Sequence, residues 1–130
     1  MVVDTSALVA IMTGEPEQAA FIAAIDRAET CLLSTVTLVE ASIVMEARHG
    51  PGGLHLLELL IERSGMELVD VDAAQARLAQ TAWRRFGKGR HPAGLNFGDC
   101  FPYALALARG EPLLFKGADF SQTDILPAVP

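Results

Sequence analysis

Short apolar segments alternate with longer segments of mixed polarity along most of the chain. The apolar segments have the length of buried strands and are MVVD (1–4), CLLS (31–34), MELVDV (66–71) and PLLFKG (112–117). Helix-length segments separate them, and a helical crossover is what joins two parallel strands. The pattern therefore predicts an α/β fold: a three-layer α/β/α sandwich with a four- to five-stranded, mainly parallel sheet.

Capping residues and chain breakers set the expected bounds of the helices. The predicted helices cover residues 5–12, 17–28, 35–50, 52–65 and 72–87, and a last one starts near Gly98 or Asp99. Asp4, Thr5 or Ser6 caps the first helix in this interpretation. Pro102 then falls in the first turn of the last helix, where backbone N–H groups have no intrahelical partner in any case.

The composition of the chain fits one compact domain over residues 1–130. Hydrophobic residues make up 51% of it and aromatic residues only 6%, so the core must consist mainly of aliphatic side chains. We expect Cys31 and Cys100 to be buried thiols, with a disulfide as the alternative. No signal peptide and no apolar run of about 20 residues is evident, which predicts a cytoplasmic protein without a membrane segment.

The net charge of −6 argues against a general nucleic-acid binder, since such proteins are usually basic. The segment RRFGKGRH (84–91) is an exception, because four cationic side chains gather in it. It is either a solvated loop beside a helix end or a local phosphate-binding patch. The cations concerned are Arg84, Arg85, Lys88 and Arg90; His91 is not expected to be a general base.

Four acids are expected at one edge of the sheet. Asp4 ends the first strand, Glu40 lies in the second turn after CLLS, Asp99 opens the helix before the last strand, and Asp119 follows that strand. Parallel strands place their carboxyl ends and the following helix N-termini together, where open α/β proteins bind ligands. Each acid also has an ordinary reading, because Asp4 and Asp99 could be helix caps and Asp119 a turn residue.

Glu40 is the hardest of the four acids to explain structurally. Its helical neighbours include Val36, Ile43 and Val44, so burial is expected to cost its carboxylate much of its hydration. Such an acid must be paired, protonated or bound to a cation. Lys116, after the last strand, is a cation that could approach.

Gathered carboxylates repel one another unless positive charge joins them. An all-oxygen set suits Mg²⁺ or Mn²⁺, and Mg²⁺ usually takes one or two protein carboxylates together with waters and substrate phosphate. Zinc is not expected, because no Cys or His stands at ligand spacing. The sequence thus predicts a metal site at this edge.

With those acids in order, the chain resembles the PIN-domain family and, within it, the VapC-type toxins of bacterial toxin–antitoxin pairs. The matching segments are VVDTSAL (2–8), STVTLVEASIVMEARHG (34–50), FGKGRHPAGLNFGDCFPYALA (86–106) and PLLFKGADFSQTDI (112–125). DTSAL is weak alone, whereas the glycine-rich segment around Asp99 is specific. The resemblance implies an α/β/α fold and a Mg²⁺- or Mn²⁺-dependent endoribonuclease that inhibits translation. It also implies a neutralising antitoxin and a homodimer.

Matched residue by residue, the resemblance implies an acidic site of Asp4, Glu40, Asp99 and the more variable Asp119. Asp4 and Asp99 are then the principal metal ligands, Glu40 assists directly or through water, and Asp119 places a second metal or its waters. Thr5 or Ser6 then donates a hydrogen bond to the Asp4 carboxylate or to the substrate phosphate. The alternative is that these residues only cap the helix. Pro102 departs from the family pattern and puts the catalytic rate in doubt.

The sequence is compatible with three other classes of protein. A receiver-like phosphoacceptor domain needs paired acids after the first strand, where Asp4 stands alone, and Asp70 and Asp72 imitate its central aspartate only in part. A haloacid-dehalogenase-like phosphatase needs an Asp where this chain has Ser6. A non-catalytic RNA- or protein-binding module would bind without metal.

Overall fold

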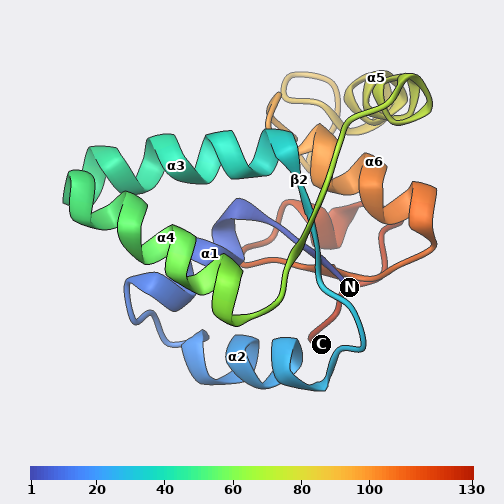
Figure 1. The fold of residues 1–130 in the computed structure, drawn as a ribbon. Helices are drawn as coiled ribbons and strands as arrows, with labels where there is room; N and C mark the ends of the chain where they lie inside the picture. Colours follow the sequence, from blue (N-terminus) through green and yellow to red (C-terminus); the bar gives the residue numbers. More distant parts are fainter.

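The computed structural model describes residues 1–130 and contains a parallel sheet with helices on both faces (Figure 1). In chain order the elements are β1 (Val2–Val3), α1 (Thr5–Met12), α2 (Gln18–Arg27), β2 (Leu32–Ser34), α3 (Thr35–His49), α4 (Pro51–Arg63), β3 (Glu67–Val69), α5 (Ala73–Phe86), α6 (Cys100–Arg109), β4 (Leu113–Leu114) and the 3₁₀ turn η1 (Phe120–Gln122). Every predicted strand and helix is present, the strands are shorter than predicted, and only η1 was not expected.

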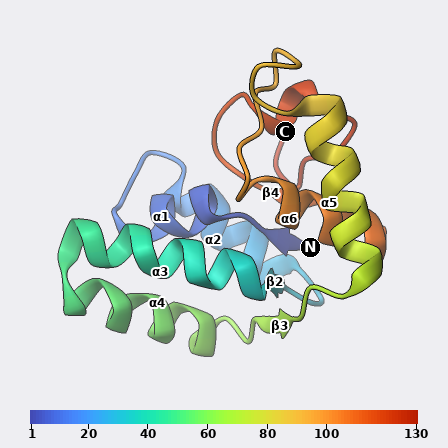
Figure 2. The same ribbon diagram turned by 90° about the horizontal axis from the view of Figure 1, so that it is seen from above.

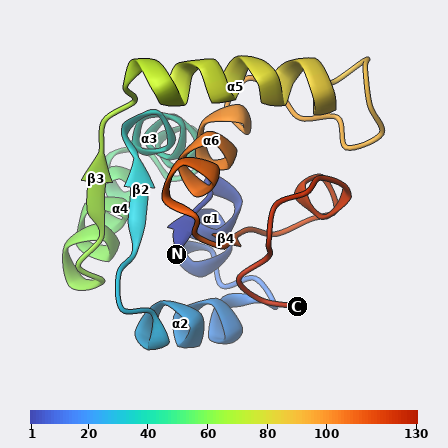
Figure 3. The same cartoon turned by 90° about the vertical axis from the view of Figure 1, so that its right-hand side faces the viewer.

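The sheet has the strand order β3-β2-β1-β4, and all its pairs are parallel. Val2 of β1 lies opposite Leu32 of β2 on one side and Leu113 of β4 on the other. An isolated bridge between Leu113 and Pro127 adds a single further pairing beyond β4. β3 and β2 run side by side in Figure 3, and the expected parallel sheet is confirmed.

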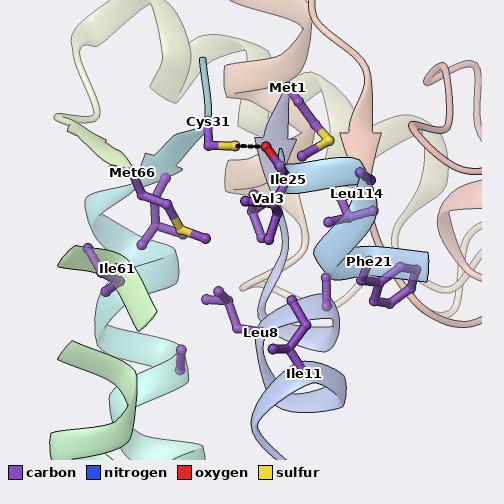
Figure 4. Close-up of a cluster of buried hydrophobic side chains, with 14 of the residues drawn as sticks. Met1, Val3, Leu8, Ile11, Phe21, Ile25, Cys31, Ile61, Met66 and Leu114 are labelled. Atoms are coloured by element: carbon purple, nitrogen blue, oxygen red, sulfur yellow. Dashed lines mark hydrogen bonds between the residues drawn. The ribbon is translucent and has the colours of Figure 1, made fainter. Parts of the chain in front are cut away.

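The residues of β1, β2 and β4 alternate between two hydrophobic clusters, one on each face of the sheet. Val3, Leu33 and Leu114 belong to the cluster that α1, α2 and α4 cover (Figure 4). Their neighbours Val2, Leu32 and Leu113 belong to the cluster under α5 and α6. Figure 2 shows α1 to α4 on one side of the molecule and α5 and α6 on the other. Successive strand side chains point to opposite faces, so both faces of these short strands are buried.

The two cysteines lie in different clusters and both are free thiols. Cys31 belongs to the cluster of α1, α2 and α4, and its thiol donates to the carbonyl of Ile25 at 3.9 Å (Figure 4). Cys100 belongs to the cluster on the opposite face. The sheet separates them, so the expectation of buried thiols is confirmed.

The start of α6 accommodates Pro102 as the sequence predicted. Pro102 is the third residue of α6 and is buried. Just before it, the N–H of Cys100 donates to the carbonyl of Phe97 and that of Phe101 to the carbonyl of Gly98. A tight turn thus precedes the helix, and the missing N–H of proline costs little in this first turn.

The helices are too short or too polar for a membrane: none combines the length and the hydropathy needed to cross a bilayer.

Candidate metal centre

Three of the predicted acids line one open hollow of about 460 Å³ at the carboxyl edge of the sheet. We call it the acidic cleft. Asp4 reaches it from the end of β1, Glu40 from the second turn of α3, and Asp99 from the start of α6. Its other lining residues are Thr5, Ser6, Val9, Glu15, Val44, Arg48, Asn96, Lys116 and Gly117.

Asp4 is buried with one carboxylate oxygen unpartnered. The residue is 3% exposed, and its Oδ2 accepts hydrogen bonds from the N–H and the hydroxyl of Ser6 as it caps α1. Its Oδ1 is buried without a hydrogen-bond partner. Burial raises the pKa of Asp4 to about 6; the Ser6 bonds oppose this rise and the nearby Glu40 charge adds to it. A buried acceptor of this kind is costly unless a cation or donor reaches it.

Glu40 is fixed between α1 and the turn before α6. The hydroxyl of Thr5 donates to its Oε1 at 2.5 Å. Gly98 lies so close that a Cβ on it would overlap the carboxylate and come within 2.7 Å of Cδ. Glycine at position 98 thus leaves room for the Glu40 carboxylate beside the turn before α6.

The expected apolar burial of Glu40 is wrong in part. Its carboxylate is half-buried against Gly98, but Val39 and Ile43 beside it on α3 are 57% and 64% exposed. The apolar side chains around Glu40 form a surface of the protein because no other element covers that side of α3. The periodicity of the helix could not distinguish an exposed apolar face from a buried one.

Asp99 and Asn96 form a reciprocal pair. The N–H of Asp99 donates to Asn96 Oδ1 at 2.9 Å, and the N–H of Asn96 donates to Asp99 Oδ2 at 3.0 Å. This is the geometry of a capping box, which fixes the carboxylate at the helix start. Burial raises the pKa of Asp99 to about 7 against the lowering effect of the Asn96 bond, and the charges of Asp4, Glu40 and Asp119 add to the rise. Asn96 was not predicted from the sequence, although its spacing of three residues from Asp99 is a capping-box signal.

Lys116 does not neutralise these acids. Its Nζ lies 3.2 Å from carboxylate oxygens of both Glu15 and Glu17. Its backbone N–H donates to Ser6 Oγ at 2.9 Å. No lysine or arginine is within 4.0 Å of the carboxylate oxygens of Asp4, Glu40 or Asp99. Lys116 and Arg48 line the same cleft, but neither is in ion-pair contact with the three carboxylates, which therefore lack a direct counter-charge.

Asp119 stands apart from the other three acids. It is exposed on the turn that leads into η1 and does not line the acidic cleft, although its charge helps to raise the pKa of Asp99. It lies beside the cleft rather than in it.

The predicted basic patch lies outside the acidic cleft. All four of its cations are exposed and none lines the cleft; they are Arg84, Arg85, Lys88 and Arg90. Arg85 pairs with Asp124 at 3.3 Å. His91 accepts from the N–H of Ala93. The cleft contains instead Arg48, an exposed residue of α3 that was not predicted from the sequence to belong to the site.

The donor set of the cleft fits a hard divalent cation. As the side chains stand, no three His, Cys, Asp or Glu residues come close enough together to hold one ion. The unpartnered Oδ1 of Asp4, the raised pKa of Asp99 and the missing counter-charge nevertheless favour a cation that takes one or two carboxylates and completes its shell with water. No His or Cys lines the cleft, so zinc does not fit.

Comparison with known proteins identifies the family. The family model of the PIN domain matches residues 1–126, and the chain therefore belongs to the PIN-domain family. Among its relatives, ribonuclease VapC30 of Mycobacterium tuberculosis is 51% identical over 125 residues, covering 96% of this chain and 95% of that protein. Ribonuclease VapC of Mycolicibacterium smegmatis is also 51% identical, over 96% of this chain and 97% of its own length. Ribonuclease VapC42 of M. tuberculosis is 45% identical and covers 98% of each chain.

Solved structures have the same fold at low sequence identity. M. tuberculosis VapC20, described as a Sarcin-Ricin loop cleaving toxin, superposes with a TM-score of 0.77 at 20% identity, over 99% of this chain and 98% of its own. VapBC2 from Rickettsia felis, described as bound to a DNA fragment from their promoter, gives 0.76 at 13% identity over 97% and 94%. These likenesses agree with the three-layer sandwich, and membership of the PIN-domain family excludes the receiver and dehalogenase readings.

Proposed function

We propose that this chain is a Mg²⁺- or Mn²⁺-dependent endoribonuclease that acts as the toxin of a toxin–antitoxin pair and inhibits translation by cutting RNA. The observation that carries the metal-dependent part is the buried, unpartnered Oδ1 of Asp4 in a cleft that Glu40 and Asp99 share without a counter-charge. The names of the VapC ribonuclease relatives support the substrate class. Residues 1–130 act in this proposal as one domain.

The chain's own residues orient the acids for this chemistry. Asp4 and Asp99 would hold the divalent ion, Glu40 would assist directly or through water, and Asp119, which lies beside the cleft, would position a second ion or its waters. When bound, such an ion lowers the pKa of a water molecule and offsets the charge that develops on the phosphate. Ser6 fixes Asp4 Oδ2 so that Oδ1 stays free, and Thr5 orients Glu40.

The decisive experiment incubates the purified chain, freed from any partner protein, with total RNA. The wild type is assayed with Mg²⁺ and with EDTA, and Asp4→Asn is assayed with Mg²⁺. Cleavage is expected only for the wild type with Mg²⁺, because the neutral amide cannot supply the charge that binds the ion. Equal cleavage in all three arms would indicate a contaminant or another mechanism. Metal-independent RNA binding without cleavage, unchanged in Asp4→Asn, would favour the non-catalytic module.

Arg48 is expected to contact the RNA backbone. It lines the acidic cleft, and no carboxylate lies within 4.0 Å of its guanidinium group. Arg48→Gln should weaken RNA binding roughly tenfold. It should also reduce the slope of log K against log salt concentration by about 1, which corresponds to the loss of one phosphate contact. Binding is measured in EDTA, so that cleavage does not interfere.

The matched control for Arg48 is Arg90→Gln, which removes an exposed cation outside the cleft. A smaller loss is expected there. If Arg90→Gln weakened binding more than Arg48→Gln, the main phosphate contacts would belong to residues 84–91 instead.

A cognate antitoxin is the proposed protein partner, and the cytoplasm is the proposed location. The support is the similarity to VapC ribonucleases and the VapBC2 likeness in fold. RNA substrate and free thiols at Cys31 and Cys100 are consistent with a reducing compartment.

We also propose that two copies pair through an apolar face of α3. Val39, Ile43 and Phe97 are 57%, 64% and 73% exposed, and together with Val36 and Val44 they line a hollow of about 560 Å³. Apolar surface gathered in this way is typical of a protein interface, and a two-fold pairing would cover the same face of both copies.

Ile43→Glu is expected to convert a dimer into a monomer in analytical ultracentrifugation, because the charge would be buried at the interface. Leu126→Glu is the control, since Leu126 is 67% exposed and does not line this hollow. If Ile43→Glu stayed dimeric but failed to bind the antitoxin, the face would belong to the antitoxin instead.

A further inference from the structure

Two glutamates on one turn hold the lysine that borders the acidic cleft. Glu15 and Glu17 flank Pro16 between α1 and α2, and each places a carboxylate oxygen 3.2 Å from Lys116 Nζ. All three side chains are between 31% and 37% exposed, so the contacts are partly shielded from water. This triad is the only set of ion pairs at the cleft.

The turn that carries the glutamates is fixed without Lys116. Gly14 has a φ of 69°, and the N–H of Glu15 returns to the carbonyl of Ala10 at 3.0 Å, which is a Schellman-type helix end. Gln18 strengthens the turn, because its side chain donates to the carbonyl of Ile11 at 2.6 Å. The backbone that carries the two glutamates is therefore positioned independently of Lys116.

Lys116 is equally fixed on the other side. It follows β4, and its backbone N–H donates to Ser6 Oγ, which itself donates to Asp4. Lys116 and the carboxylates of Asp4 and Asp99 line the same hollow. A lysine ammonium released from its glutamates would be attracted to the unpartnered Oδ1 of Asp4, where it would compete with a divalent ion.

We propose that Glu15 and Glu17 sequester Lys116 and thereby keep the Asp4 and Asp99 carboxylates available to a divalent cation. The inference rests on the proposed metal site. Glu15, Glu17 and Lys116 are positioning residues here, and none of them is a metal ligand.

A simpler effect of the glutamates must be separated from this one. Two negative charges near the cleft would attract a cation through their field alone, whether or not Lys116 is present. If the glutamates act through their field, replacing them should weaken cation binding equally with and without Lys116. If they act by sequestration, replacing them should weaken binding only when Lys116 is present. A double-mutant cycle distinguishes the two.

The experiment measures Mn²⁺ affinity of the full chain by titration calorimetry and by the electron paramagnetic resonance signal of free Mn²⁺. The proteins are the wild type, Glu15→Gln/Glu17→Gln, Lys116→Met and the triple variant; all substitutions have similar side-chain size, and circular dichroism checks their folding. The double variant should bind Mn²⁺ at least tenfold more weakly. Lys116→Met should change affinity less than threefold, and the triple variant should return to within about threefold of the wild type.

Two results would overturn the inference while leaving the metal site intact. One is Mn²⁺ binding that the double substitution does not change; the other is an equal loss with and without Lys116. Asp4→Asn, which should abolish the binding, locates the Mn²⁺ in the acidic cleft. A wild type that binds no Mn²⁺ would overturn the metal site and this inference together. In the first two results the wild type still binds Mn²⁺, so the two kinds of failure are distinguishable.

Discussion

Asp99→Asn is expected to raise the free energy of unfolding of the metal-free protein by about 2 kcal/mol at pH 8 while it lowers RNA cleavage at least 100-fold. In the folded chain the pKa of Asp99 is about 7, against 3.8 for the ordinary side chain. An acid whose folded pKa is raised supports folding fully below its unfolded pKa, and this support is lost as the pH rises through the folded pKa. At pH 8 the charge is therefore a cost that the amide removes.

The expected increase in the free energy of unfolding is about half of what the full rise in the pKa of Asp99 implies, because Asp99 is only half-buried and water screens part of its charge. Urea unfolding in EDTA at pH 8 and at pH 4.5 measures it, and the advantage of the variant should shrink at the lower pH. Asp26→Asn, on the exposed side of α2, should change stability little at either pH. If Asp99→Asn were less stable than the wild type at pH 8, the cleft would already supply a counter-charge and the argument for a cation would fail.

Gly98→Ala is expected to reduce cleavage at least tenfold with a change in unfolding free energy below about 1 kcal/mol. The φ of Gly98 is not in the left-handed region, so alanine can adopt its backbone conformation. The new Cβ would overlap the carboxylate of Glu40 and displace it from Thr5. Because the end of a flexible side chain is what moves, the site should suffer far more than the fold.

Gly52→Ala is the matched control for this prediction. Gly52 lies in the first turn of α4 with no atom within 4 Å of the added Cβ and no left-handed φ. Activity should stay unchanged there when both variants are assayed by initial cleavage rate and urea unfolding. A fully active Gly98→Ala protein would show that the position of Glu40 does not matter. Partial recovery in Gly98→Ala/Glu40→Asp would show that the overlap is the cause, since the shorter acid avoids it.

The acidic cleft shows which parts of a site can be read from local patterns. Asp4 and Asp99 were placed correctly because each follows or opens a predicted element, and parallel strands bring those ends to one edge. Asn96 was within reach of the same reasoning, because the capping-box spacing to Asp99 is local. Arg48 was out of reach of such reasoning, because which face of α3 meets the cleft depends on how α3 lies against α1 and α6.

The sequence by itself determined the order of strands and helices, the parallel sheet and the edge at which Asp4, Glu40 and Asp99 meet. These follow from hydrophobic period and caps, which act between residues close together in the chain. Only the tertiary structure decided three features of the site. Lys116 forms ion pairs with Glu15 and Glu17, Gly98 leaves room for the Glu40 carboxylate, and one apolar side of α3 is exposed. Those features depend on contacts and ion pairs between side chains from distant segments of the chain. A local sequence pattern does not show which of these side chains come into contact.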